Sequence, residues 1–120
     1  MKSQVVVFTA VVFSLMVAGF VLAHDNHTCP HDTGTVQGLR DCVTHAASEG
    51  HIDNPGVAKS LLAKLDAAQA AVDRDQPAVA INNLQAFIRE VQAQSGKHID
   101  AEHAGHLAAH ATGLIEALSE

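Results

Sequence analysis

From residue 35 onward, apolar side chains recur every three or four residues in four separate segments. This spacing places them along one face of an α-helix, whereas a half-buried strand would alternate apolar and polar residues. No part of the sequence shows that alternation. We therefore expect an all-α fold, in which four amphipathic helices joined by short links pack as a small antiparallel four-helix bundle.

Capping residues, prolines and glycines set the expected limits of the first two helices. The first helix is expected over residues 35–49, because its apolar pattern begins after Thr35 and stops at Gly50. The second helix is expected to begin at Asp53-Asn54-Pro55. A side-chain oxygen there caps the first turn, and proline fits because its missing N–H has no partner in that turn.

The limits of the last two helices follow in the same way. The second helix is expected to end in the polar stretch from Asp73 to Gln76, and Asp75 with Pro77 is expected to open the third helix. The third helix is expected to end at Gly96, since glycine readily takes the conformation that ends helices. Asp100 is expected to cap the fourth helix, which extends to about Leu118.

Each expected helix has one apolar stripe that faces the core of the bundle. Many of these positions are alanine, which lets neighbouring helix backbones approach closely. The expected core consists of Val36, Leu39, Val43, Ala46 and Ala47 in the first helix, Val57, Leu61, Leu62, Leu65, Ala68 and Val72 in the second, Ala80, Leu84, Phe87, Ile88 and Val91 in the third, and Ala104, Leu107, Ala111, Leu114, Ile115 and Leu118 in the fourth.

The first 23 residues differ from the rest, because one charge, Lys2, is followed by an apolar run that ends at Ala23. This pattern predicts an export signal. Val21 and Ala23 stand at the −3 and −1 positions of a cut before His24, where a signal peptidase requires small or β-branched residues. The run is also just long enough to cross a bilayer as an uncleaved anchor. Cleavage is favoured because no cluster of Lys or Arg follows Ala23.

Cleavage divides the chain into a signal peptide over residues 1–23, a polar His-rich segment over residues 24–34 and one helical domain over residues 35–120. We expect a secreted protein, extracellular or periplasmic, with no membrane association after cleavage. Without Lys2 the chain has 6 basic and 13 acidic residues, a net charge of −7 with His neutral. Such a charge repels phosphate backbones, so nucleic-acid binding is not expected.

Cys29 and Cys42 are the only cysteines, and both follow the expected export signal. An oxidising compartment favours a disulfide between them. Closing that loop would stabilise the folded domain by ~3 kcal/mol in the chain-entropy model. The alternative is a metal site of Cys29, His31, Cys42 and His45, because a histidine closely follows each cysteine.

Three short motifs follow one another between residues 56 and 115. An SL-x2-KL motif is formed by Ser60, Leu61, Lys64 and Leu65. An N-x-L-x-AFI-x2-V motif is formed by Asn82 or Asn83, Leu84, Ala86, Phe87, Ile88 and Val91. An SGK-x-I turn is formed by Ser95, Gly96, Lys97 and Ile99. With the spaced Ala and Leu of the last segment, these motifs resemble the FIMAH domain family, and the resemblance extends back to Val36.

The resemblance implies an extracellular helical module, of a kind often appended to the C-terminal end of secreted bacterial enzymes and surface proteins. It implies no catalytic residues. The chain also carries His and Cys residues that the family pattern does not require. These residues are therefore candidates for a property that the resemblance does not explain.

Histidine is unusually frequent, with nine in the chain. His103, His106 and His110 fall on one side of the expected fourth helix, and imidazole suits Zn²⁺, Cu²⁺ and Ni²⁺. These three positions span about 10 Å of helix rise, so all three cannot bind one ion. We expect any metal site here to use a pair of them, completed by His45 or His51.

The His-rich N-terminal segment is a second candidate metal site. A chain that begins at His24 offers an amine and an imidazole on one residue, with His27 and His31 close behind. The alternative for all of these histidines is that they are solvated side chains. No cofactor is required by the sequence, and Zn or Cu are the ions that these side chains would take.

The sequence gives no reason to expect an enzyme. It contains no Gly-framed Ser, no lone activated Cys and no Gly-rich phosphate loop, and Asp66, Asp73, Glu90 and Glu102 are expected to be ordinary surface charges. The first hypothesis is a secreted, non-catalytic interaction or accessory module with an unknown protein, glycan or cell-envelope partner. The second is an exported metal-binding protein that uses its His-rich segments.

Overall fold

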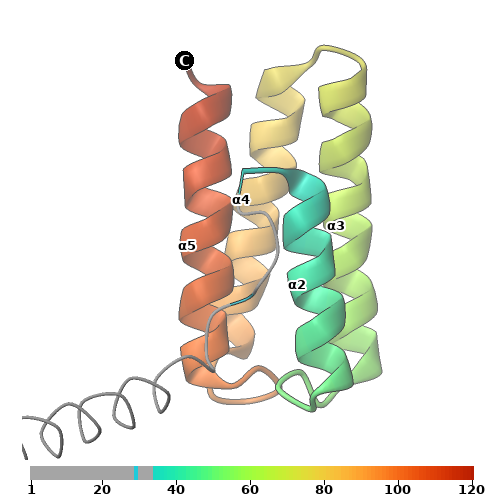
Figure 1. Ribbon diagram of the computed structural model, residues 1–120, viewed down its shortest axis with the longest axis vertical. Helices are drawn as coiled ribbons and strands as arrows, with labels where there is room; N and C mark the ends of the chain where they lie inside the picture. Colours follow the sequence, from blue (N-terminus) through green and yellow to red (C-terminus); the bar gives the residue numbers. More distant parts are fainter. Residues whose placement is uncertain (1–28, 30–33) are drawn as a thin grey trace, which may run out of the picture.

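The computed structural model describes residue 29 and residues 34–120, so the predicted signal peptide and most of the segment 24–34 lie outside the described residues. Over the described range the chain forms four α-helices, α2 (Val36–Ser48), α3 (Pro55–Asp73), α4 (Pro77–Gln94) and α5 (Ala101–Leu118). They pack side by side as an antiparallel bundle (Figure 1). The predicted all-α bundle is therefore confirmed.

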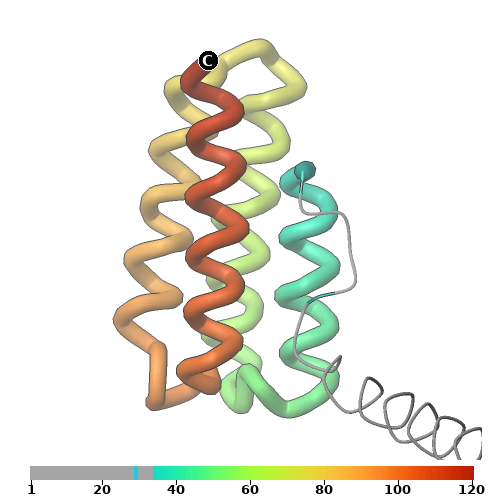
Figure 2. Tube along the Cα trace, turned by 60° about the vertical axis from the view of Figure 1, so that its left-hand side comes forward, coloured from blue at the N-terminus to red at the C-terminus, as the bar shows by residue number. Residues whose placement is uncertain are grey.

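Each helix of the bundle contacts two neighbours. α3 and α5 both pack against α2 and against α4, which gives the ring order α2–α3–α4–α5 that Figure 2 shows. α2 has 13 residues whereas α3 has 19, so α2 covers only part of the length of the bundle. The link between α3 and α4 and the C-terminal end of α5 lie at the end that α2 does not reach (Figure 1).

The interior of the bundle is apolar and centres on Phe87, which is the largest fully buried side chain of the described residues. Phe87 belongs to one buried cluster that includes leucine, valine and alanine side chains from the four helices. No polar or charged residue is buried among the described residues. Removal of this apolar surface from water is the main driving force for folding.

Most of the predicted core positions are buried, and the clearest exception is at the end of α3. Val72 was expected in the core, but it is 37% exposed, and Ala71 is buried in its place. α2 is shorter than α3 and does not reach the end of the bundle where α3 ends (Figure 1), so it does not cover the last turn of α3, to which Val72 belongs. Five other predicted core residues are only partly buried at the edge of the core: Ala47, Leu62, Ile88, Ile115 and Leu118.

The start of α4 also differs from the expectation. Asp75 was expected to cap this helix, but Gln76 is the residue before it, and its side chain makes no capping hydrogen bond. Asp75 instead has a φ of 57°, and the N–H groups of Asp75 and Gln76 donate to the carbonyls of Val72 and Ala71. A left-handed residue with these bonds ends a helix, so Asp75 terminates α3 rather than opening α4.

The predicted disulfide between Cys29 and Cys42 is present, with the two Cα atoms 5.6 Å apart. Cys42 is buried in α2, so the bond holds residue 29 against this helix. Both sulfur atoms are used in this bond, so neither is a free thiolate.

Candidate functional site

Two copies of the same tripeptide pair at one end of the bundle. His51-Ile52-Asp53 lies in the link between α2 and α3, and His98-Ile99-Asp100 lies in the link between α4 and α5. Ile52 and Ile99 form an antiparallel bridge. The Asp100 N–H donates to the His51 carbonyl at 2.8 Å, and the Asp53 N–H donates to the His98 carbonyl at 3.0 Å. The two links are thus joined as a short ladder.

Each link reaches this ladder through a glycine in the left-handed region. Gly50, which directly precedes the first tripeptide, has a φ of 86°, and Gly96, two residues before the second, has a φ of 75°. Glycine takes these angles without the steric cost that other residues meet. Ile52 and Ile99 are 4% and 1% exposed, so they anchor the ladder to the core of the bundle.

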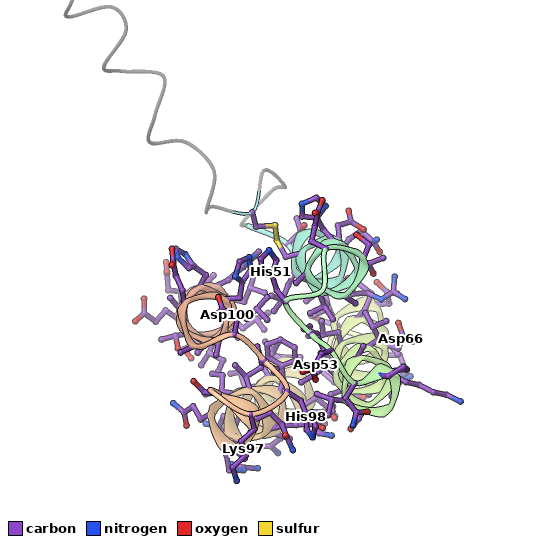
Figure 3. All side chains as sticks on the ribbon, turned by 90° about the horizontal axis from the view of Figure 1, so that it is seen from below. His51, Asp53, Asp66, Lys97, His98 and Asp100 are labelled. Atoms are coloured by element: carbon purple, nitrogen blue, oxygen red, sulfur yellow. A yellow bond between two sulfur atoms is a disulfide. The ribbon has the colours of Figure 1, made fainter. Side chains whose placement is uncertain are left out.

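Antiparallel pairing places a histidine opposite an aspartate on either side of the two isoleucines (Figure 3). On one side, His98 Nδ1 lies 2.8 Å from Asp53 Oδ1, and both side chains are exposed. On the other side, His51 lies opposite Asp100. The first turn of α5 adds a third side chain to this second pair, His103.

His51, Asp100 and His103 form a compact cluster. His103 Nδ1 lies 3.1 Å from Asp100 Oδ2, and the rings of His51 and His103 stack with centroids 3.7 Å apart and planes 14° apart. One potential ligand atom from each of the three residues lies within 4.8 Å of the other two. The His103 side chain is 18% exposed, whereas that of Asp100 is 51% exposed. The cluster therefore lies at the surface with one well-packed ring.

The Asp100 carboxyl is affected by the histidine beside it. The hydrogen bond with the His103 side chain is the main reason that the pKa of Asp100 is lowered from its ordinary value. With Asp100 ionised, its oxygens only accept hydrogen bonds, so the His103 ring nitrogen is the donor. The cluster thus consists of a carboxylate and two imidazoles, which together are a normal ligand set for a divalent transition metal.

Of the histidines predicted to bind metal, the structure brings together His51 and His103. His106 does not join them, because its ring lies 6.5 Å from that of His103 and its Nε2 is 3.9 Å from Glu102 Oε1. His110 lies elsewhere on α5, with Nδ1 4.0 Å from Cys42 Sγ. His45 lies near Glu49 on α2, and the N-terminal candidates His24, His27 and His31 lie outside the described residues.

Sequence reasoning missed the carboxylate of this cluster. Asp100 was expected to cap α5, and it does precede the helix, but its side chain makes no capping hydrogen bond. The reason is that the His103 ring lies within reach and takes the carboxylate as its partner. The sequence signal that identifies Asp100 is the repeat of His-Ile-Asp at 51–53 and 98–100, each within two residues of the start of a helix.

A shallow groove between α2 and α3 is the larger hollow near these links, with a volume of about 770 Å³. Apolar side chains such as Ile52, Ala58 and Leu62 line it. The Arg40 and Asp66 side chains join across it, with Arg40 Nε 2.7 Å from Asp66 Oδ1. This ion pair connects two helices, so Asp66 has a more specific contact than the surface position expected for it.

Glu90 also differs from the surface charge expected. Its side chain is only 19% exposed, and its Oε1 lies 2.8 Å from both Lys64 Nζ and Ser60 Oγ. Lys64 Nζ donates to Ser60 Oγ as well, at 3.0 Å. Ser60 and Lys64 belong to the SL-x2-KL motif of α3, so this network connects α3 to α4.

Comparison with known proteins adds one positive finding. The family model described as FIMAH domain matches residues 36–116, which run from the first residue of α2 into the last turns of α5. No curated protein and no solved structure matches the chain. Among the described residues, no helix has the length and apolar character needed to cross a membrane.

Proposed function

Because this chain belongs to the FIMAH domain family, we propose that it is an exported, non-catalytic helical module that acts by binding a partner outside the cell membrane. The observation that carries this proposal is the extent of the family match, which includes all four helices. The partner is a protein, a glycan or another component of the cell envelope. The role belongs to the helical surface, since the interior is closed and apolar.

Two further features support the proposal. The Cys29–Cys42 disulfide is typical of an oxidising compartment such as the periplasm or the extracellular medium. The net charge of −7 after removal of residues 1–23 disfavours nucleic acid as the partner. Both features agree with the export signal that the first 23 residues predict.

The export step is tested by expression of the full chain in a bacterial host, followed by fractionation and intact-mass measurement without reductant. We expect a periplasmic or secreted product that begins at His24 and lacks two hydrogen atoms because of the disulfide. Ala23→Leu is the control, because a large residue at the −1 position should block cleavage. A reduced, uncleaved wild-type chain in the cytosol would contradict the proposal.

The binding role is tested with the fluorescently labelled mature protein. It is incubated with purified cell walls, insoluble polysaccharides and whole cells of the producing strain, and the bound fraction is measured after sedimentation. We expect saturable binding to one of these materials, with competition by unlabelled protein. A protein that none of these materials retains, or that hydrolyses one of them, would contradict a non-catalytic envelope-binding role.

A further inference from the structure

Beyond partner binding, we propose that His51, Asp100 and His103 bind one divalent transition-metal ion, such as Zn²⁺, at the end of the bundle where the two His-Ile-Asp tripeptides pair. The site draws its ligands from the α2–α3 link, the α4–α5 link and the first turn of α5. A bound ion would therefore join the two helical hairpins of the fold.

The spacing of the ligand atoms fits such an ion. Zn²⁺ binds imidazole nitrogen and carboxylate oxygen at about 2.0–2.2 Å, which separates two ligand atoms of a tetrahedral site by about 3.4 Å. His103 Nδ1 and Asp100 Oδ2 lie 3.1 Å apart, and the whole set lies within 4.8 Å. For the ion to bind His103 Nδ1, the ring proton moves from Nδ1 to Nε2, so that Nδ1 offers its lone pair to the ion in place of the hydrogen bond with Asp100.

One ring must turn for the ion to bind. The His51 and His103 rings stack with planes only 14° apart, so the lone pairs of their nitrogens lie side by side rather than pointing at one centre. Rotation of the His51 side chain would aim its nitrogen lone pair at the ion. His51 is only partly buried, which leaves room for this rotation. The backbone needs no movement, because the Asp100–His51 hydrogen bond of 2.8 Å already holds the two residues together.

The second His-Asp pair of the ladder shows why one site is expected rather than two. Asp53 and His98 belong to the same two tripeptides and lie 2.8 Å apart, but no third potential ligand joins them among the described residues. Three residues after Asp100 the chain has His103, whereas three residues after Asp53 it has Gly56. The third residue of α3 is Val57, which is buried in the core. This second pair is thus a natural control for the proposed site.

Three protein ligands leave one position of a tetrahedral ion open. Asp100 is half exposed, so this position faces solvent, where a water molecule or a donor atom from a partner completes the coordination. The net charge of −7 further favours a cation over an anion at this surface. The ligand set of two nitrogens and one oxygen suits Zn²⁺, Cu²⁺ or Ni²⁺ better than Ca²⁺ or Mg²⁺, which prefer oxygen.

The test is isothermal titration of the mature protein, freed of metal by a chelator, with Zn²⁺. We expect one equivalent to bind with sub-micromolar affinity, and we expect His51→Ala and His103→Ala each to weaken that equivalent by about 100-fold or more. Asp100→Asn should weaken it too, because the carboxylate charge is lost. His98→Ala is the matched control and should keep the wild-type affinity, because His98 lies in the pair without a third ligand.

A second readout separates loss of the site from loss of the fold. A ligand that binds only the folded state raises the melting temperature, so Zn²⁺ should stabilise the wild type and His98→Ala but not His51→Ala or His103→Ala. Circular dichroism without metal should show the same helix content for all four proteins. The proposal is overturned if wild-type binding is only millimolar, if His51→Ala binds like the wild type, or if His98→Ala loses as much affinity as His51→Ala.

Discussion

Asp100 makes two contacts of different kinds with the two histidines beside it. Its backbone N–H donates to the His51 carbonyl, and its carboxylate accepts from the His103 ring. The backbone bond sets the position of the residue, and the side-chain bond determines its charge state. Because the second contact requires the ionised form, the pKa of Asp100 is lowered.

This contact predicts a change in stability at acid pH. A carboxyl group whose pKa is lowered by folding stabilises the protein at pH values above its ordinary pKa of about 3.9. That stabilisation is lost as the pH falls through the lower pKa of the folded state. In metal-free protein, we expect the melting temperature of Asp100→Asn to fall less between pH 6 and pH 2.5 than that of the wild type. Thermal melts across this range measure the difference, and equal losses in the two proteins would argue against the contact.

Gly96 gives a second prediction at the scale of one residue. An alanine at this position would have a Cβ with no atom within 4 Å, so the cost comes only from its φ of 75°. We expect Gly96→Ala to lower the free energy of unfolding by about 1 kcal/mol, as measured by urea denaturation. Gly113→Ala is the control with the opposite sign: it lies within α5, also meets no atom within 4 Å, and should stabilise by about 0.5–1 kcal/mol.

At the scale of helices, the Ser60–Lys64–Glu90 network joins α3 to α4 through partly buried charges. We expect Lys64→Met to reduce the free energy of unfolding by about 1 kcal/mol, because the Glu90 carboxylate then keeps only the Ser60 hydroxyl as a partner. Lys59→Met, at an exposed position of the same helix, should change it by less than about 0.5 kcal/mol. Equal effects of the two changes in urea denaturation would show that the network adds no specific stability.

α2 is the shortest helix of the bundle, and the disulfide is its covalent link to residue 29. A cross-link that closes a loop of this size restricts the unfolded chain. We therefore expect reduction of the disulfide in the wild type to lower the free energy of unfolding by ~3 kcal/mol. Urea denaturation with and without a phosphine reductant measures this value. The Cys29→Ser variant, which cannot form the bond, should match the reduced protein and should not respond to the reductant.

At the scale of the whole molecule, most of the fold follows from the sequence because the helix limits depend on local chemistry. A side chain of the Asp53-Asn54-Pro55 motif was predicted to cap α3, and the structure shows that it is Asn54, which accepts from the N–H groups of Gly56 and Val57 at 2.8 and 3.2 Å. The prediction that Val72 lies in the core was wrong because the exposure of this residue depends on the length of another helix, α2. Asp75 was misplaced because an aspartate next to a proline suits both the end of one helix and the start of the next.

The candidate site was only partly predictable, because it also depends on contacts between different parts of the chain. His51 and His103 were among the predicted ligands, but a helical pattern identifies neighbours on one helix, and these two residues come from different parts of the chain. Their contact depends on how the two links pair at the end of the bundle, which tertiary packing decides. The repeat of His-Ile-Asp is the one local signal of that pairing, because each copy supplies the partner of the other.

The position of this ladder also gives the bundle a closed end and an open end. At the closed end, the backbone hydrogen bonds between the links hold the hairpin α2–α3 to the hairpin α4–α5. At the open end, α2 is absent and only the turn at Asp75 connects α3 to α4 (Figure 2). Spontaneous local opening therefore begins at the open end, and hydrogen exchange should be fastest there. A ligand at the closed end would remain bound while the far turns of α3, α4 and α5 fray and close again.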